Sequence, residues 1–142
     1  MRNIKTGITF GCFDLCHAGH VLMLEECKQY CDYLIVGLQV DPSEERPSKN
    51  KPIQDLFERH TQLKAVTWVD EVIPYRFEHE IITMLQALSV DVRFVGEDYI
   101  DKDFTGKIYC IENGIELLYN TRRHNFSTSE LRRRLEDSHN RK

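Results

Sequence analysis

Short apolar runs alternate along the chain with segments whose apolar residues recur at helical spacing. The run over residues 33–40 is almost continuously apolar, which is typical of a strand buried on both faces of a parallel sheet. Further strands are predicted at 5–10, 69–74 (stopped by Pro74), 90–95 and 115–119. Helical spacing predicts helices that open near His17 and cover 56–67, 78–88, 104–113 and 127–136.

This alternation predicts a doubly wound, Rossmann-like α/β fold, with a five-stranded parallel sheet and helices on both faces. The 142 residues fit a single domain that buries roughly two-thirds of its unfolded surface. We expect this domain to span residues 1–136, followed by a disordered tail over 137–142. Ligands of such sheets bind outside the carboxyl ends of the strands, so the loops there are the candidates for a site.

Composition limits the kinds of binding partner and the cellular location that we expect for this protein. A net charge of -4 argues against a nucleic-acid surface, and we interpret Arg132, Arg133 and Arg134 as a solvated helix face. With no apolar run near 18 residues and no leader at Met1, we expect a cytoplasmic protein without membrane insertion. The five cysteines lack the spacing of common zinc ribbons, so burial as small hydrophobes is favoured over a metal or redox module.

The most informative stretch follows the first strand and reads Gly-Cys-Phe-Asp-Leu-Cys-His-Ala-Gly-His over residues 11–20. A strand, a turn and a helix that opens near His17 direct backbone N–H groups toward an anion. The helix dipole strengthens that attraction, and the imidazoles of His17 and His20, three residues apart, add further donors. These residues predict a site for a phosphate chain.

Three further loops follow predicted strands. Residues 122–128 place a guanidinium (Arg122) and hydroxyls at the start of the last helix, which forms a second anion cradle. Residues 96–99 are Gly-Glu-Asp-Tyr, and 41–51 carry Asp41, Lys49 and Lys51 on a polar, proline-containing loop. Their position after strands favours one active site built from separated loops.

Residues 11–20 resemble the [T/C]-F-D-x-x-H-x-G-H motif of the cytidylyltransferase-like nucleotidyltransferases. Residues 122–128 resemble the R-T-x-G-[I/V]-S-T segment of the cytidylyltransferases, although Arg123, His124 and Asn125 depart from it, and 96–99 resemble G-[D/E/S]-D-[W/Y]. Glu58-Arg59 resembles an E-x-R motif that in relatives fixes a helix against the site.

The resemblance implies a set of functional residues. His17, His20 and Arg122 are implied as catalytic. The implied nucleotide-binding residues are Thr9, Phe10, Gly11, Cys12, Phe13, Asp14, His17, Gly19, His20, Gly96, Asp98, Tyr99, Arg122, Phe126, Ser127 and Thr128. Asp41, Lys49, Lys51 and Arg59 are further candidates for contacts with phosphates or the acceptor. Asp14 is the candidate ligand or second-shell group for Mg²⁺ or another divalent cation. Relatives are commonly dimers, so a homodimer is expected.

The expected activity is transfer of CMP from CTP to a phosphomonoester or phosphonate acceptor, with release of pyrophosphate. Arg122, five residues before Ser127, favours CTP, and the alternative is an adenylyltransferase that uses ATP on a sugar phosphate or FMN. The acceptor stays open among glycerol phosphate, phosphoethanolamine, sugar phosphates and phosphonates. A regulatory nucleotide-binding module without turnover is a further alternative, against which His17, Gly19 and His20 argue.

Overall fold

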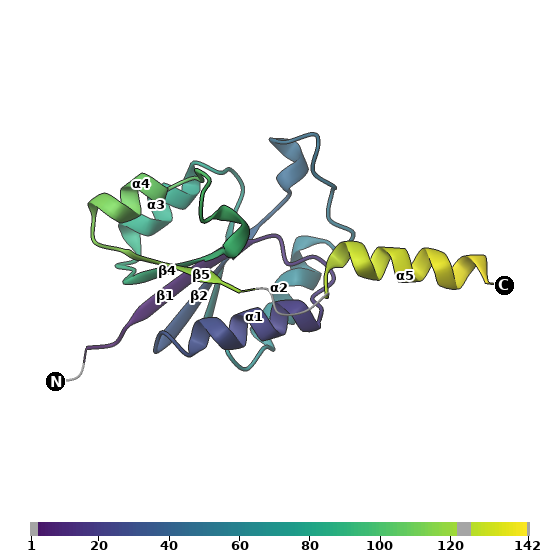
Figure 1. The fold of residues 1–142 in the computed structure, drawn as a ribbon, viewed down its shortest axis with the longest axis horizontal. Coiled ribbons are helices and arrows are strands. Elements are labelled where there is room, and N and C mark those ends of the chain that lie inside the picture. Colours follow the sequence, from purple (N-terminus) through teal and green to yellow (C-terminus); the bar gives the residue numbers. More distant parts are fainter. Residues whose placement is uncertain (1–2, 122–125, 142) are drawn as a thin grey trace.

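The computed structural model describes residues 3–121 and 126–141 and contains one sheet of five parallel strands in the order β3-β2-β1-β4-β5. The strands are β1 (Thr6–Gly11), β2 (Tyr33–Gln39), β3 (Glu71–Tyr75), β4 (Val92–Gly96) and β5 (Glu116–Asn120). Figure 1 shows the sheet with the helices around it. Since β1 lies at the centre and the chain winds outward in both directions from it, the switch point falls at the ends of β1 and β4.

Helices cover both faces of the sheet (Figure 1). They are α1 (Ala18–Lys28), α2 (Leu56–Lys64), α3 (Glu80–Ala87), α4 (Lys107–Glu112) and α5 (Thr128–Asn140), with short 3₁₀ turns η1 (Pro42–Glu44) and η2 (Glu97–Tyr99). One core cluster joins α1 and α2 to the sheet through Leu24 and Leu63, and a second joins α3 and α4 through Leu85 and Cys110. The predicted fold class is confirmed.

Several element boundaries differ from the prediction. Pro74 does not stop β3 but lies inside it, exposed, because β3 is an edge strand where a missing N–H costs little. The helix expected from residue 104 begins only at Lys107, since Gly106 takes a left-handed backbone conformation with φ of 84°. The last helix does not end near Glu136 but continues to Asn140.

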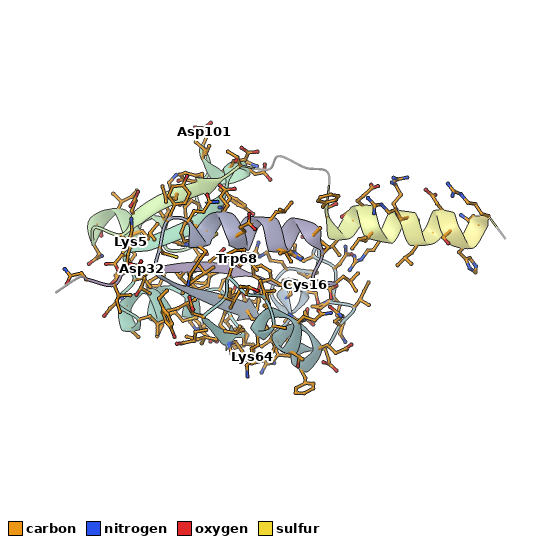
Figure 2. The ribbon with its side chains drawn as sticks, turned by 90° about the horizontal axis from the view of Figure 1, so that it is seen from below. Lys5, Cys16, Asp32, Lys64, Trp68 and Asp101 are labelled. Atoms are coloured by element: carbon orange, nitrogen blue, oxygen red, sulfur yellow. The ribbon has the colours of Figure 1, made fainter. Side chains whose placement is uncertain are left out.

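Helix α5 extends away from the sheet in both views (Figures 1 and 2). It contains no buried residue, and only its first turns contact the rest of the molecule. None of the helices in the described ranges combines the length and apolarity needed to cross a bilayer.

Candidate active site

Two adjoining pockets lie at the carboxyl ends of the strands. The first, which we call the helix pocket, has a volume of about 500 Å³ and lies between α1, η2 and the start of α5. The second, the sheet pocket, has a volume of about 830 Å³ and lies over the ends of β1, β2 and β4. Residues that line both are His20, Met23, Gly96, Asn120 and Thr128. The pockets therefore meet at the carboxyl-terminal edge, where the sequence predicted the site.

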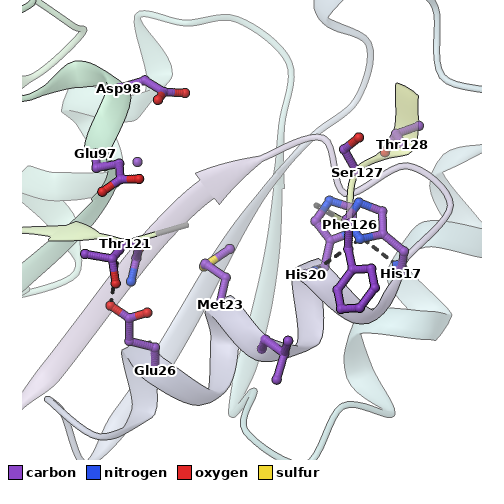
Figure 3. Close-up of a pocket in the computed structure, with 14 residues that line it drawn as sticks. His17, His20, Met23, Glu26, Glu97, Asp98, Thr121, Phe126, Ser127 and Thr128 are labelled. Atoms are coloured by element: carbon purple, nitrogen blue, oxygen red, sulfur yellow. Dashed lines mark hydrogen bonds between the residues drawn. The ribbon is translucent and has the colours of Figure 1, made fainter. Parts of the chain in front are cut away.

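The two histidines of the motif cap helix α1 reciprocally (Figure 3). Nδ1 of His17 accepts from the backbone N–H of His20, and Nδ1 of His20 accepts from the backbone N–H of His17, each at 3.3 Å. Their rings stack with centroids 3.8 Å apart. Because Nδ1 is used as an acceptor, the proton of each neutral imidazole lies on Nε2, so each ring can donate a hydrogen bond from Nε2.

His20 is neutral at physiological pH. Burial and, to a smaller extent, the neighbouring His17 lower its pKa to about 3, while Asp14 acts in the opposite direction. The Phe13 ring lies 5.1 Å from the His20 ring and contributes to that apolar surrounding. His20 therefore acts as a neutral donor to an anion in this conformation, since a proton on Nδ1 would break the cap.

Lowering the pH is expected to destabilise the fold through His20. The unfolded imidazole takes up a proton near pH 6.5, whereas the folded one does so only near pH 3, so protonation favours the unfolded chain as the pH falls. Between pH 7 and 5 this amounts to about 2 kcal/mol of unfolding free energy. Denaturant unfolding of the wild type and of His20→Gln across this range measures it.

The His20→Gln variant should lose less stability on acidification than the wild type, whereas substitution of the exposed His79 by glutamine should leave the wild-type profile unchanged. Parallel profiles for the wild type and His20→Gln would show that His20 is not the group responsible.

The loop between β1 and α1 is held by the Asp14 carboxylate. Its two oxygens accept hydrogen bonds from the backbone N–H groups of Ile53 (2.9 Å) and Gln54 (3.0 Å), and Arg132 forms an ion pair with it at 3.3 Å. Asp14 is 7% exposed. With both oxygens engaged and a cation beside them, Asp14 does not fit a magnesium ligand, and we assign no chemistry to a metal there.

No group of three or more His, Cys, Asp or Glu side chains within residues 3–121 and 126–141 is arranged to hold a metal ion. The cysteines in particular are separate thiols, and burial raises the pKa of Cys12 and Cys16 beside the site.

Arg59 fixes the ends of β1 and β2 rather than a ligand. Its guanidinium donates to the backbone carbonyls of Cys12 (3.1 Å), Gln39 (2.6 Å), Val40 (2.5 Å) and Gln54 (3.1 Å). The side chain is 2% exposed. This agrees with the architectural role that the E-x-R resemblance implied, and it leaves no support for a contact with phosphate or acceptor.

Most of the other predicted residues do line the pockets. The helix pocket is lined by His17, Gly19, His20, Gly96, Asp98, Phe126, Ser127 and Thr128. The sheet pocket is lined by Thr9, Phe10, Gly11, Cys12, Phe13, Asp14, His20, Lys49, Gly96, Tyr99 and Thr128. Asp41, Lys51 and Arg59 are absent from both linings. Arg122 lies outside the described residues.

Asp41 has a local role in the loop. Its carboxylate accepts from the Ser43 backbone N–H (2.9 Å) and hydroxyl (2.6 Å), and the hydroxyl contact lowers the pKa of Asp41. Lys51 is exposed. Of the two lysines, only Lys49 reaches a pocket lining.

The sequence interpretation of residues 132–134 was wrong for one of the three arginines. Arg132 lines the sheet pocket and pairs with Asp14, whereas Arg133 and Arg134 pair with Glu130 on the helix surface. The missed signal is spacing: Arg132 follows Thr128 by four residues, and the Thr128 hydroxyl donates to the Asp14 carbonyl at 3.2 Å. Further lining residues that the sequence did not single out include Glu26, Tyr75, Arg93 and Asn120.

Comparisons with known proteins agree with this geometry. The family model described as Cytidylyltransferase-like matches residues 8–134. The glycerol-3-phosphate cytidylyltransferase of Bacillus spizizenii (strain ATCC 23059 / NRRL B-14472 / W23) is 35% identical over 131 residues, which cover 92% of this chain and 96% of that protein. The bifunctional protein HldE of Caulobacter sp. (strain K31) is 37% identical over 114 residues, covering 80% of this chain and 23% of HldE.

The chain thus spans about a quarter of the length of the HldE relatives it matches. Among solved structures, the lipopolysaccharide core biosynthesis protein from Thermoplasma volcanium GSS1 superposes with a TM-score of 0.68 at 22% identity, covering 87% of this chain and 100% of that one. That likeness supports the fold alone. The family model covers most of the chain, and the motif residues lie together at its pockets. The chain therefore belongs to the cytidylyltransferase-like family of nucleotidyltransferases.

Proposed function

We propose that this protein transfers CMP from CTP to a phosphomonoester or phosphonate acceptor and releases pyrophosphate. The observation that carries the proposal is the reciprocal His17–His20 cap, which makes both imidazoles donors from Nε2 at a helix N-terminus. Such donors, fixed before the reaction, stabilise charge that develops on phosphate oxygens.

The helix pocket suits the nucleotide. The N-termini of α1 and α5 meet there, capped by His17 and Ser127, so that two helix dipoles attract the same phosphate chain. The side chains of Leu22, Met23 and Phe126 give the same pocket an apolar surface that can accept a base and ribose. Figure 3 shows His17, His20 and Phe126 close together beside Ser127.

The sheet pocket suits the acceptor. Its lining carries the cationic side chains Arg46, Lys49, Arg93 and Arg132, and it meets the helix pocket at His20. A phosphate held in the sheet pocket therefore approaches a nucleotide in the helix pocket across His20.

The reaction is a single displacement at the α-phosphorus. An oxygen of the acceptor's phosphate or phosphonate forms a bond to that phosphorus as the bond to the pyrophosphate oxygen breaks. No general base is needed, because a phosphate whose second pKa is near 6 is largely ionised at pH 7. Within this chain, His17 and His20 hold the α-phosphate and the leaving oxygen, and catalysis rests on positioning and charge stabilisation.

We expect CTP to be preferred to ATP by about ten-fold or more in kcat/KM, which corresponds to about 1.4 kcal/mol of transition-state binding. The likeness to a glycerol-3-phosphate cytidylyltransferase over nearly its whole length supports CTP, as does the resemblance of residues 122–128. Pyrophosphate release with each nucleotide against a panel of phosphomonoesters and phosphonates measures the preference, with each nucleotide alone as the control.

A larger kcat/KM for ATP would replace the cytidylyltransferase assignment by the adenylyltransferase alternative. If pyrophosphate were released with neither nucleotide for any acceptor in the panel, nucleotidyl transfer itself would be contradicted.

A further inference from the structure

One of the four cationic side chains of the sheet pocket, Arg93, forms no ion pair with an acidic side chain in the part of the chain that the structure describes. Arg93 is on β4, and its guanidinium carbon is 5.0 Å from the centre of the Phe10 ring and 4.9 Å from that of Phe104. The residue is 6% exposed and lines the sheet pocket together with Phe10, Tyr75 and Phe104. The Arg93 guanidinium therefore makes a cation–π contact with each of the two rings.

The guanidinium of Arg93 contacts the Thr105 carbonyl and the Cys110 thiol, but its Nε is unused. Nη1 donates to the backbone carbonyl of Thr105, and Nε is buried without a hydrogen-bond partner among the described residues. The edge that contains Nε is the side-on fork that matches the two oxygens of a carboxylate.

The acidic side chains of the sheet pocket are engaged elsewhere. Glu78 forms an ion pair with Arg46, and Asp103 accepts a hydrogen bond from the backbone N–H of Phe104. None of the ion pairs found among the described residues includes Arg93. A buried cation without a counter-charge costs several kcal/mol of stability, so its retention in a pocket points to an anionic ligand.

Two glycines, Gly37 and Gly106, leave the space that the Phe10 ring and the Arg93 guanidinium occupy. A Cβ atom at Gly37 would lie 2.3 Å from the Phe10 ring, so only glycine allows that ring its place beside Arg93. A Cβ atom at Gly106 would lie 2.9 Å from Nη1 of Arg93, and this glycine also needs its left-handed backbone. The Phe10 and Phe104 rings are therefore in place beside Arg93 before any ligand binds.

We propose that Arg93 binds a carboxylate of the acceptor substrate, so that the acceptor carries an attacking phosphate or phosphonate at one end and a carboxylate at the other. This inference rests on the proposed function, because it assigns the acceptor to the sheet pocket. A singly charged carboxylate matches the charge and the fork geometry of the single guanidinium. The volume of about 830 Å³ is large enough for such a two-headed acceptor.

Two small acceptors test the proposal, because they differ only at the end remote from the phosphate. 3-Phosphoglycerate carries a carboxylate where glycerol 3-phosphate carries a hydroxymethyl group. Calorimetric binding of each to the wild type, to Arg93→Met and to Arg76→Met gives a readout that does not depend on turnover. Arg76 is the matched control, since it is exposed, pairs with Glu44 and is absent from the lining of both pockets.

We expect the wild type and Arg76→Met to bind 3-phosphoglycerate at least ten-fold more tightly than glycerol 3-phosphate, and Arg93→Met to bind the two equally. The unbranched methionine keeps most of the packing between the rings, and thermal unfolding of the variant checks that it is folded. Equal affinity of the wild type for the two compounds, or no binding of either, would overturn the proposal. A preference that persists in folded Arg93→Met would overturn it as well.

Pyrophosphate release with the same compounds separates this inference from the proposed function. Selective binding of 3-phosphoglycerate without pyrophosphate release from CTP or ATP would support the carboxylate site and contradict the transfer reaction. Equal kcat/KM for the two acceptors would support the transfer reaction and contradict the carboxylate site.

Discussion

Replacement of His17 or His20 by alanine is expected to lower kcat by about a hundred-fold or more, which is the scale seen when one preorganised donor to a developing charge is lost. In the capped conformation Nδ1 of each imidazole accepts a backbone hydrogen bond, which leaves Nε2 as the donor, and His20 lies where the helix and sheet pockets meet. Their effect should be on kcat rather than on nucleotide affinity, since the charge that they stabilise grows in the transition state.

Loss of the helix cap must be separated from loss of the donor in this experiment. Asparagine is a strong N-cap residue whose side-chain oxygen can accept from the backbone N–H of His20, as Nδ1 of His17 does. His17→Asn should therefore unfold at nearly the wild-type temperature and still lose activity as His17→Ala does. A folded His17→Asn enzyme with near wild-type kcat would assign His17 a structural role only.

Replacement of Arg59 by methionine is expected to lower the free energy of unfolding by about 3 kcal/mol or more. Four backbone carbonyls at the ends of β1, β2 and the loop before α2 lose their donor, and a buried acceptor without a partner costs about 1–3 kcal/mol. Since Cys12 and Gln39 line the sheet pocket, activity should fall together with stability.

Urea unfolding of Arg59→Met, with Arg134→Met as the control, measures this loss. Arg134 is exposed and pairs with Glu130 on the surface of α5, where an ion pair contributes at most about 1 kcal/mol. A change below about 1 kcal/mol for Arg59→Met would contradict the role of Arg59 as the clamp between β1 and β2.

The order of elements could be predicted from the sequence because burial imposes simple periodicities. The apolar run over 33–40 became β2, whose residues after Tyr33 are all buried, and the capping pattern at Ser127 became the start of α5. The predicted element boundaries were wrong where contacts between elements, rather than the local sequence, determine where a helix or strand begins or ends. Pro74 is tolerated in β3 only because that strand is at the edge, which a sequence does not reveal before the strand order is known.

The place of the site could be predicted, but its internal arrangement could not. Phe13 and Leu15 take left-handed backbone conformations, with φ of 52° and 51°, which local propensity disfavours for such residues. Contacts from Asp14 and Arg59 to residues distant in sequence hold the loop in that form. The reciprocal histidine cap likewise depends on the orientation of both imidazole rings. The three-residue spacing of the two histidines does not predict that orientation.

Residues from outside the motifs completed the pockets. In the sequence, Arg93 appears only as part of a strand and Arg132 only as part of a charged helix surface, whereas the structure places both in the lining of the sheet pocket. A charged residue in a strand next to a predicted switch point is the signal that could have identified Arg93.

The central claim is that an acceptor phosphate oxygen attacks the α-phosphorus of the nucleotide at the His17–His20 cap. The most direct measurement is ³¹P NMR of the product formed from CTP and an acceptor whose phosphate oxygens are labelled with ¹⁸O. The proposed reaction predicts labelled oxygen in the bridge between the CMP phosphorus and the acceptor phosphorus, with unlabelled pyrophosphate as the second product. A product without ¹⁸O in that bridge, or release of CDP in place of pyrophosphate, would contradict it.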